Sequence, residues 1–382
     1  MSQPQDPFKE IRPYKDTEVV DVLNGLLRND ELVSAVCSYQ FPNASGPLGW
    51  LLKPVVRIAL ARKLGDVETI QDFQMLMASY MEKMISRTTR NLTVSGIDEL
   101  DPEEGYLFVS NHRDIAMDPA FVNWVRHQFG MDTVRIAIGD NLLTKPYVSD
   151  LMRLNKSFIV NRSATAPREM MAAFTQLSAY IDDCIQHNHS VWIAQREGRA
   201  KDGNDRTDPT ILKMFYMSHR KAKRDFPTAM KRLKIVPVSI SYQYDPCDAL
   251  KAKELHAKQV DGHYEKGEHE DIASIVEGIR GYKGDVHVAF GDVIENDFDT
   301  PEDLAAEIDR QIHATYKLHS SNLLAAGEAE EVDESEASAF EARMADLSQE
   351  QQAIFKRMYA FPLENRRAVE AIQTQKDKAC LA

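Results

Sequence analysis

The sequence predicts an α/β fold: a mainly parallel (mixed) central sheet flanked by helices, with a helical segment before it and a small helical tail after it. Between residues 91 and 325, short apolar runs that end in polar residues alternate with longer stretches of helical spacing. Such alternation requires crossover connections, which place helices on both faces of a parallel sheet. The chain of 382 residues suffices for one large domain or two smaller ones.

Composition argues against several classes of protein. The net charge of −13 argues against a nucleic-acid-binding protein. The four cysteines contain no CxxC pair, which fits a reducing compartment and predicts neither a disulfide framework nor a zinc site. The polar N-terminus predicts no secretory signal, and without an apolar run of about 18 residues we expect no membrane-spanning helix.

Residues 1–90 are predicted to form an N-terminal helical segment, one part of which is basic. The stretch from Trp50 to Leu64, WLLKPVVRIALARKL, is dense in apolar residues, carries Lys and Arg, and contains no acid. A basic amphipathic segment of this kind can lie in the interface of an anionic membrane. A core helix whose cationic side chains extend to water fits the same pattern equally well.

Residues 91–325 are predicted to form the main domain. Strands are expected at residues 91–95, 106–109, 133–138, 156–161, 190–194, 234–242 and 285–290, and helices at 120–129, 141–154, 166–187, 209–223 and 301–318. The charged stretch 245–271 has few large apolar residues and is interpreted as a surface excursion. Residues 326–382 are predicted to be an acidic linker, GEAEEVDESE, and a helical tail that opens with the capping-box pattern SQEQ.

The main candidate site follows the apolar run 106–109. His112 comes shortly after this predicted strand, with carboxylates at Asp114 and Asp118. Asp118 precedes Pro119, which predicts a helix that Asp118 caps and that proline begins. A histidine with a carboxylate behind it is a general base, because the carboxylate fixes its tautomer and orientation. A loop histidine beside an ordinary helix cap is the alternative interpretation.

Two further strand ends carry charged residues. Arg162 ends the strand at 156–161, and the strand at 190–194 is followed by Glu197, Gly198, Arg199 and Lys201. Since the carboxyl ends of parallel strands lie along one edge, these residues could share a site with His112. The guanidinium group matches phosphate oxygens, and no GxSxG or equivalent nucleophile motif is present. The pattern suggests direct transfer onto a hydroxyl of a phosphorylated acceptor.

The sequence resembles the glycerolipid acyltransferases, which include glycerol-3-phosphate and 1-acylglycerol-3-phosphate acyltransferases. The resemblance covers about Asn91 to Ile294. It rests on five blocks in the family's order: NLTVSG with VSNHR, FIVNRS at 158–163, EGR at 197–199, VPVS at 236–239 and FGDVI at 290–294. Each block alone is weak, and their order and spacing together are strong.

The resemblance implies the roles of the site residues. His112 would be the base, oriented by Asp118, while Arg113, Arg162, Glu197, Gly198, Arg199 and Lys201 would bind the acceptor. Arg162 and Arg199 would hold its phosphate. The expected reaction requires neither a metal nor a redox cofactor.

Two departures from the family pattern stand out. Five residues separate His112 from Asp118, where the family usually has four. Either the loop bulges and Asp118 still orients the histidine, or Asp114 takes that role, or the pair is broken; we favour the bulge. In the third block, Gln195 and Arg196 replace the usual phenylalanine-proline lead. This second departure affects the identity of the acceptor more than the type of reaction.

The sequence therefore predicts a peripheral membrane enzyme of phospholipid biosynthesis, at the cytoplasmic face of the inner membrane. Its expected donor is acyl-CoA or acyl carrier protein, and its expected acceptor is 1-acylglycerol 3-phosphate, with glycerol 3-phosphate as the alternative. A catalytically inactive lipid-binding protein and a metal-dependent phosphoesterase are the other classes considered. The basic cluster at 213–234 could be a solvated face or a docking patch for carrier protein, coenzyme A or anionic lipid.

Overall fold

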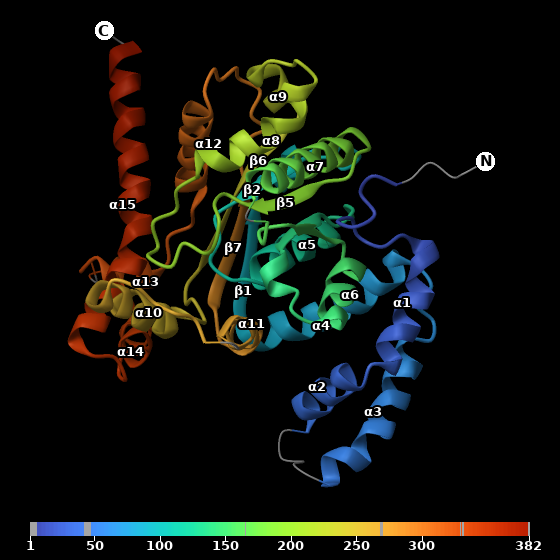
Figure 1. The fold of residues 1–382 in the computed structure, drawn as a ribbon. Coiled ribbons are helices and arrows are strands. Elements are labelled where there is room, and N and C mark those ends of the chain that lie inside the picture. The colour runs from blue at the N-terminus through green and yellow to red at the C-terminus, as the bar shows by residue number, and fades with distance from the viewer. Residues whose placement is uncertain are drawn as a thin grey trace. The chain divides into compact units, whose positions relative to one another are not determined.

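The computed structural model describes residues 6–41, 47–164, 166–267, 270–328, 330 and 332–380 (Figure 1). The chain forms two compact units: Met1–Tyr80 with Arg135–Ala173, and Met81–Val134 with Phe174–Ala382. These units divide the chain differently from the predicted segments 1–90, 91–325 and 326–382, because residues 135–173 belong with the N-terminal helices. None of the described helices combines the length and apolar character needed to cross a membrane.

The first unit is built mainly from helices. Its elements are α1 (Asp16–Arg28), α2 (Asp30–Gln40), α3 (Pro47–Leu64), the greater part of α4 (Ile70–Thr88), β3 (Arg135–Gly139), α6 (Pro146–Leu154), β4 (Ser157–Val160) and the start of α7 (Pro167–Gln186). β3 and β4 pair in parallel. Leu154 of α6 packs in one core with Val19 and Leu23 of α1 and Phe73 of α4, which explains why this part of the chain joins the N-terminal helices.

The second unit contains a mixed sheet. Its strands are β1 (Thr89–Ser95), β2 (Leu107–Ser110), β5 (Val191–Ala194), β6 (Ile235–Tyr242) and β7 (Gly284–Phe290), in the order β1-β7-β6-β2-β5. β2 lies parallel to both β5 and β6, and β1 is parallel to β7, whereas β6 and β7 are antiparallel. The predicted α/β fold with a mainly parallel, mixed sheet is confirmed. β6 is buried along its whole length, so the sheet is covered on both faces at this strand.

Helices cover this sheet and continue into the tail. They are α5 (Met117–Gln128), most of α7, α8 (Pro209–Lys221), α9 (Phe226–Arg232), α10 (Asp248–Asp261), α11 (Glu270–Arg280), α12 (Pro301–Thr315), α13 (Ser320–Ala325), α14 (Glu334–Ala342) and α15 (Gln349–Cys380). The prediction of a surface excursion at 245–271 was wrong, since this stretch forms α10 and the start of α11. Asp248, Lys251 and Glu254 of α10 are buried in ion pairs, so its charged composition does not mark a surface loop.

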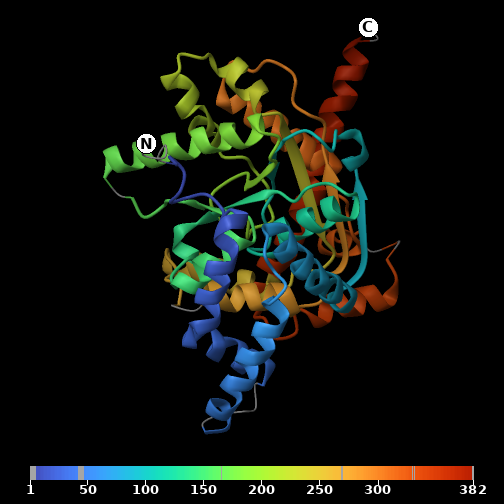
Figure 2. The ribbon, with the colours of Figure 1, turned by 90° about the vertical axis from the view of Figure 1, so that its right-hand side faces the viewer.

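The C-terminal tail is part of the second unit's core. Phe340, Met344, Phe355, Met358 and Tyr359 form one hydrophobic cluster, which also includes Tyr244 and Ala252. α15 packs against α10, α12 and α13, and Figure 2 shows it passing beside α12. The tail is therefore helical, as predicted, and is packed against the domain.

The pH dependence of stability gives one prediction for this unit. Burial lowers the pKa of His319, whose Nε2 lies 3.1 Å from the hydroxyl of Ser241, to about 4. The unfolded chain, in which histidine titrates near 6.5, therefore binds more protons between these two values, and unfolding free energy should fall as the pH drops through that window. His319→Gln should remove up to about 3 kcal/mol of this pH dependence.

Urea unfolding at pH 7, 5 and 4 measures the effect. His187→Gln, on an exposed side chain, is the matched control and should keep the wild-type slope. A slope that His319→Gln leaves unchanged would show that the histidine is not buried in its neutral form.

Candidate active site

Asn111 anchors the loop that carries the candidate base. β2 ends at Ser110, and the side chain of Asn111 continues the ladder toward β6. Its Nδ2 donates to the carbonyl of Ile240 at 3.0 Å, and its Oδ1 accepts from the amide of Ile240 at 2.8 Å. The next residue, His112, is therefore held at the carboxyl end of the strand, where open α/β sheets place their sites.

His112 and Asp118 are in direct contact. Nδ1 of the imidazole lies 2.8 Å from Oδ2 of Asp118, whose carboxylate is fully buried. A carboxylate only accepts hydrogen bonds, so this contact places the proton on Nδ1 and leaves Nε2 as the basic nitrogen. The ring of Trp192, on β5, packs edge-on against the imidazole with centroids 5.6 Å apart. The geometric prediction that Asp118 reaches His112 is confirmed.

Three more donors hold the Asp118 carboxylate. The amides of Arg113 and Asp114 donate to Oδ2 at 2.6 and 2.9 Å. The hydroxyl of Tyr242, at the end of β6, donates to Oδ1 at 2.6 Å. Burial, together with the charge of Asp118, raises the pKa of Tyr242 well above its usual value, so the phenol remains a donor. The carboxylate is thus fixed on both oxygens.

The loop between His112 and Asp118, which is one residue longer than the family pattern, is held by the side chain of Asp114. Its Oδ1 accepts from the amides of Ala116 and Met117 at 3.0 and 2.9 Å, at the start of α5. The prediction that Asp118 caps the helix and Pro119 begins it was wrong, since α5 begins at Met117. Asp114 supplies the capping carboxylate, which leaves Asp118 inside the first turn and directed at the histidine.

Arg113 does not point toward a substrate. It is buried, and its guanidinium donates to Asp205 at 2.6 Å and to the carbonyls of Ala200 and Gly203, both at 3.1 Å. The acceptor-binding role expected for Arg113 is therefore corrected: its side chain ties the loop after β5 to the loop after β2. This link could not be read from the sequence, because Asp205 lies in a stretch typical of a turn.

The loop after β5 lies beside the base. The amide of Ala200 donates to the carbonyl of His112 at 2.9 Å. Gly198 has φ +73° and is exposed, as is Glu197, so the EGR block forms a turn at the surface. Arg199 is partly buried, and its Nη1 has no hydrogen-bond partner among the described residues. This buried nitrogen is therefore a donor whose hydrogen bond no described residue accepts.

Lys201 is held by α10. Its ammonium forms an ion pair with Glu254, and both side chains are largely buried. Burial lowers the pKa of Lys201, against the raising effect of Glu254. The pair leaves this lysine less available to a phosphate than Arg199.

Arg162 lies in the first unit, just after β4. Its amide and that of Ser163 donate to Asp140, each at 3.1 Å. Its Nε also lies close to the backbone of Gly139, at whose position a β-carbon would come within 3.0 Å. The loop is ordered by these contacts, and the assignment of Arg162 to the acceptor phosphate stays a prediction.

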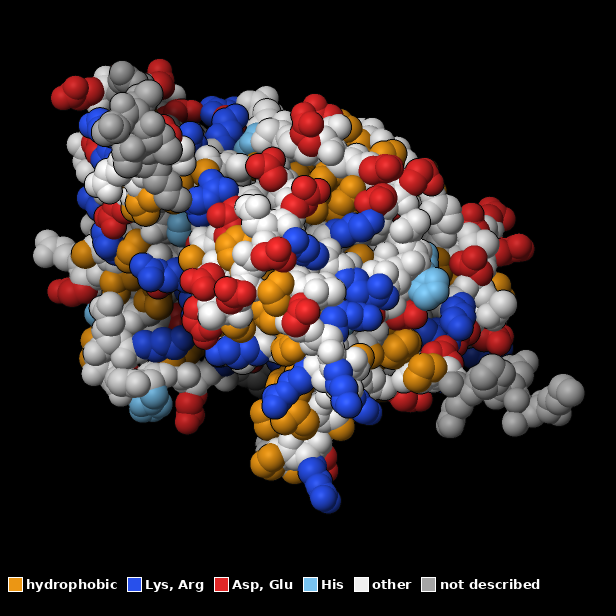
Figure 3. All heavy atoms as spheres, turned by 90° about the horizontal axis from the view of Figure 1, so that it is seen from above, with side chains coloured by type: hydrophobic (Ala, Val, Ile, Leu, Met, Phe, Trp, Pro, Cys, Tyr) orange, Lys and Arg blue, Asp and Glu red, His pale blue; other side chains and the backbone are white. Residues whose placement is uncertain are grey.

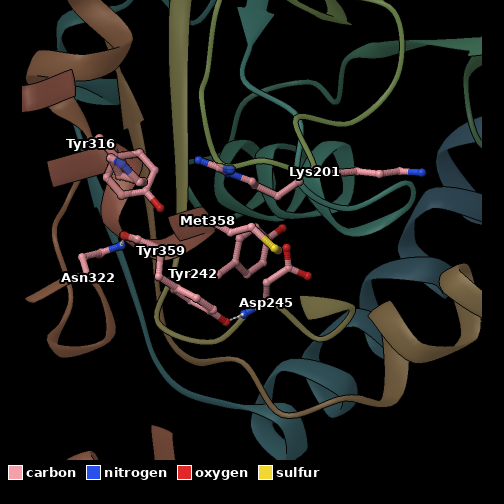
Figure 4. Close-up of a pocket in the computed structure, with 9 residues that line it drawn as sticks. Lys201, Tyr242, Asp245, Tyr316, Asn322, Met358 and Tyr359 are labelled. Carbon is pink, nitrogen blue, oxygen red and sulfur yellow. Dashed lines mark hydrogen bonds between the residues drawn. The ribbon is translucent and has the colours of Figure 1, made fainter. Parts of the chain in front are cut away.

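A polar pocket adjoins the dyad within the second unit (Figure 4). It has room for a water molecule, and Tyr242, Asp245 and Met358 lie together at its centre. Its other lining residues are Arg113, Lys201, Tyr316, Asn322, Tyr359 and Pro362. The sequence analysis gave no role to Asn111, Tyr242 or Trp192. Asn111 and Tyr242 lie at the carboxyl ends of β2 and β6, which is the signal that could have found them, whereas Trp192 lies inside β5.

No group of three or more His, Cys, Asp or Glu residues in the part of the chain that the structure describes could hold a metal ion.

The comparisons with known proteins concern the same region. A family model described as Acyltransferase matches residues 91–241. A search of curated proteins found no match. Among solved structures, the 1-acyl-sn-glycerophosphate (LPA) acyltransferase PlsC from Thermotoga maritima is 13% identical, over 84% of this chain and 98% of that one, with a TM-score of 0.38.

The matched stretch begins within β1 and ends within β6, so it contains His112, Asp118 and the loop after β5. The protein is thus an acyltransferase. Residues 91–241 form its acyltransferase domain, and four of the five sequence blocks that resemble the glycerolipid acyltransferases fall inside these matched residues.

Proposed function

We propose that the protein transfers a fatty acyl group from acyl-CoA or acyl carrier protein to the hydroxyl of 1-acylglycerol 3-phosphate. The observation that carries this proposal is the 2.8 Å contact between His112 and Asp118, which leaves Nε2 as the basic nitrogen. Nε2 takes the proton of the acceptor hydroxyl as its oxygen attacks the thioester carbonyl. A C–O bond forms, the C–S bond breaks, and the imidazolium returns the proton to the leaving thiolate.

Arg199 is proposed to bind the acceptor phosphate, and the same role for Arg162 stays a prediction. Nη1 of Arg199, which has no hydrogen-bond partner among the described residues, supports this role. A buried guanidinium N–H without an acceptor costs free energy unless a ligand supplies the acceptor. Glu197 is proposed to position the acceptor or the arginines from the exposed turn, together with Gly198. Lys201 would contribute through its charge. No metal or redox cofactor is required by this mechanism.

An inactive lipid-binding protein is disfavoured by the dyad. That alternative depends on the extra loop residue breaking the contact between His112 and Asp118, and the contact is present. Glycerol 3-phosphate remains the alternative acceptor, since the same phosphate-binding groups would serve both molecules.

The test is transfer from labelled acyl-CoA and labelled acyl carrier protein to a panel of phosphorylated acceptors. We expect 1-acylglycerol 3-phosphate to be acylated at the highest kcat/KM. Faster transfer to glycerol 3-phosphate would move the assignment to the alternative. No transfer to any phosphorylated glycerol would refute the proposal.

The basic cluster at 213–234 fits a solvated face better than a donor-docking patch. Lys213, Lys231, Arg232 and Lys234 each form an ion pair with a nearby acid. α8 and α9 also lead from the carboxyl end of β5 to the amino end of β6, so residues 220–234 lie toward the sheet edge away from His112. In Figure 3, which views the molecule from above, acidic and basic side chains are interspersed.

We further propose that α3 binds the membrane surface, on the cytoplasmic face of the inner membrane and without crossing it. Leu51, Val55 and Ile58 recur at helical spacing and are more than half exposed, at 60%, 59% and 54%. Exposed apolar residues of this spacing on a basic helix are typical of interfacial helices. Arg57 pairs with Asp30 and Lys63 donates to the hydroxyl of Tyr80, so Lys53 and Arg62 are the cations of α3 that we propose to meet anionic lipid.

Binding to vesicles that contain anionic lipid should be strong at low salt and weaker at high salt. Val55→Asp should reduce it, because a charge would enter the apolar stripe. Val20→Asp is the matched control on α1, where the valine is 48% exposed, and should bind like the wild type. Equal binding by both variants would place the membrane contact elsewhere.

A further inference from the structure

The loop of the base is also held from outside the matched domain. Lys251, on α10, is 2% exposed, and its ammonium donates to the backbone carbonyl of Arg113 at 2.6 Å. Arg113 directly follows His112, and its amide is already bound by Asp118. Both polar groups of this residue's backbone are therefore fixed, one by the orienting carboxylate and the other by Lys251.

Lys251 is in turn held by Asp245. The two side chains form a buried ion pair. Burial acts to raise the pKa of Asp245, but the charge and hydrogen bond of Lys251, the amide of Cys247 and the charge of Arg113 together lower this pKa. A buried lysine that bonds a backbone carbonyl is not explained by packing alone, because an apolar residue would fill the same volume without desolvating a charge.

Residues of the C-terminal tail hydrogen-bond the backbone of Asp245. The hydroxyl of Tyr359 accepts from the amide of Asp245 and donates to Asp248, both at 2.8 Å. Arg343 pairs with Asp248 at 2.6 Å and donates to the carbonyl of Asp245 at 2.9 Å. Burial raises the pKa of Tyr359 well above its usual value, so its hydroxyl keeps its proton.

The same tail touches the loop after β5. Gly203 has φ +80°, and a β-carbon at this position would lie 1.9 Å from the carbonyl oxygen of Met358 on α15. Gly203 is also the residue whose carbonyl accepts from Arg113. The two loops of the active site therefore meet α10 and α15 at separate points.

We propose that Lys251 is a positioning residue for His112, and that α14 and α15 maintain it in place through Asp245 and Asp248. Lys251 contacts no reacting atom. It fixes the peptide after the histidine, so that the imidazole keeps its contact with Asp118 and its direction toward the acceptor. The expected effect on kcat rests on the proposed acyl transfer. The expected effect on the hydrogen bond between His112 and Asp118 does not, because that bond can be observed without turnover.

The main test is the double variant Lys251→Met with Asp245→Asn, which removes both charges and leaves no buried charge unpaired. The introduced asparagine keeps an acceptor for the amide of Cys247, which Asp245 binds at 2.9 Å. Since a small misplacement can cost about 10²-fold, we expect kcat to fall by about 10²-fold, with KM for both substrates within about two-fold. Tyr359→Phe should lower kcat in the same direction by a smaller factor.

The activity-independent measurement is the imidazole proton resonance of the hydrogen bond between His112 and Asp118, assigned by its loss in His112→Ala. We expect it to be lost or broadened in the folded double variant. Lys258→Met, on a half-exposed lysine of the same helix, is the matched control and should keep both the resonance and kcat. If the wild type transfers no acyl group, the proposed function fails and the resonance alone decides the positioning role. A resonance retained in the folded double variant would overturn the proposal, whatever its kcat.

Discussion

Replacing His112 by alanine is expected to lower the rate of acyl transfer by about 10²- to 10⁴-fold, the usual contribution of a general base. The variant loses Nε2, which is the nitrogen left to take the acceptor proton once Asp118 binds Nδ1. The phosphate-binding groups remain, so acceptor binding should change less than kcat. Steady-state kinetics with the acceptor chosen from the panel measures both quantities.

The fold should persist in this variant. Asp118 keeps three donors after the imidazole is removed, namely two backbone amides and the hydroxyl of Tyr242, so no buried charge is left unpaired. Circular dichroism and thermal unfolding should therefore resemble those of the wild type. His187→Ala, on an exposed histidine, is the matched control and should retain full activity. Near-normal turnover by a folded His112→Ala protein would rule out the mechanism.

The sequence predicts the fold and the dyad because both depend on local patterns. Alternating strands and helices define the sheet, and a histidine after a buried strand, with carboxylates nearby, defines the base. The role of Asp114 was not predictable in the same way. Asp114 and Asp118 can each cap a helix, and only the folded loop shows that Asp114 does so and that Asp118 binds the imidazole.

Buried charges account for the larger differences. Composition does not distinguish a solvated charge from one buried in an ion pair. The charged residues of α10 therefore predict a surface segment, although Lys251 and Glu254 are buried. Arg113 was predicted to bind a ligand because its partner Asp205 lies 92 residues away in the sequence, so nothing near Arg113 indicates an internal ion pair. Contacts over such separations are set by the sheet order and leave no local signal.

The second large loss of activity is expected on replacing Asp118, whose carboxylate binds Nδ1 of His112. Asp118→Asn should lose most activity, falling by orders of magnitude, because the imidazolium that forms during transfer is no longer stabilised by a negative charge. The amide oxygen of the introduced asparagine should take the place of Oδ2, where the amides of Arg113 and Asp114 donate, and Tyr242 can turn its hydroxyl to accept from the amide nitrogen. The histidine tautomer is then preserved, so the loss measures the charge itself.

Steady-state kinetics on the folded variant measures this loss in kcat. Asp114→Asn is the matched variant. Burial and the charge of Asp118 raise the pKa of Asp114, and its Oδ2 has no hydrogen-bond partner among the described residues. The introduced asparagine can keep an oxygen at the position of Oδ1 as the acceptor for the amides of Ala116 and Met117, so Asp114→Asn should retain more activity than Asp118→Asn. Equal losses of activity in the two variants, or a larger loss in Asp114→Asn, would contradict the assignment of Asp118 as the residue that orients His112.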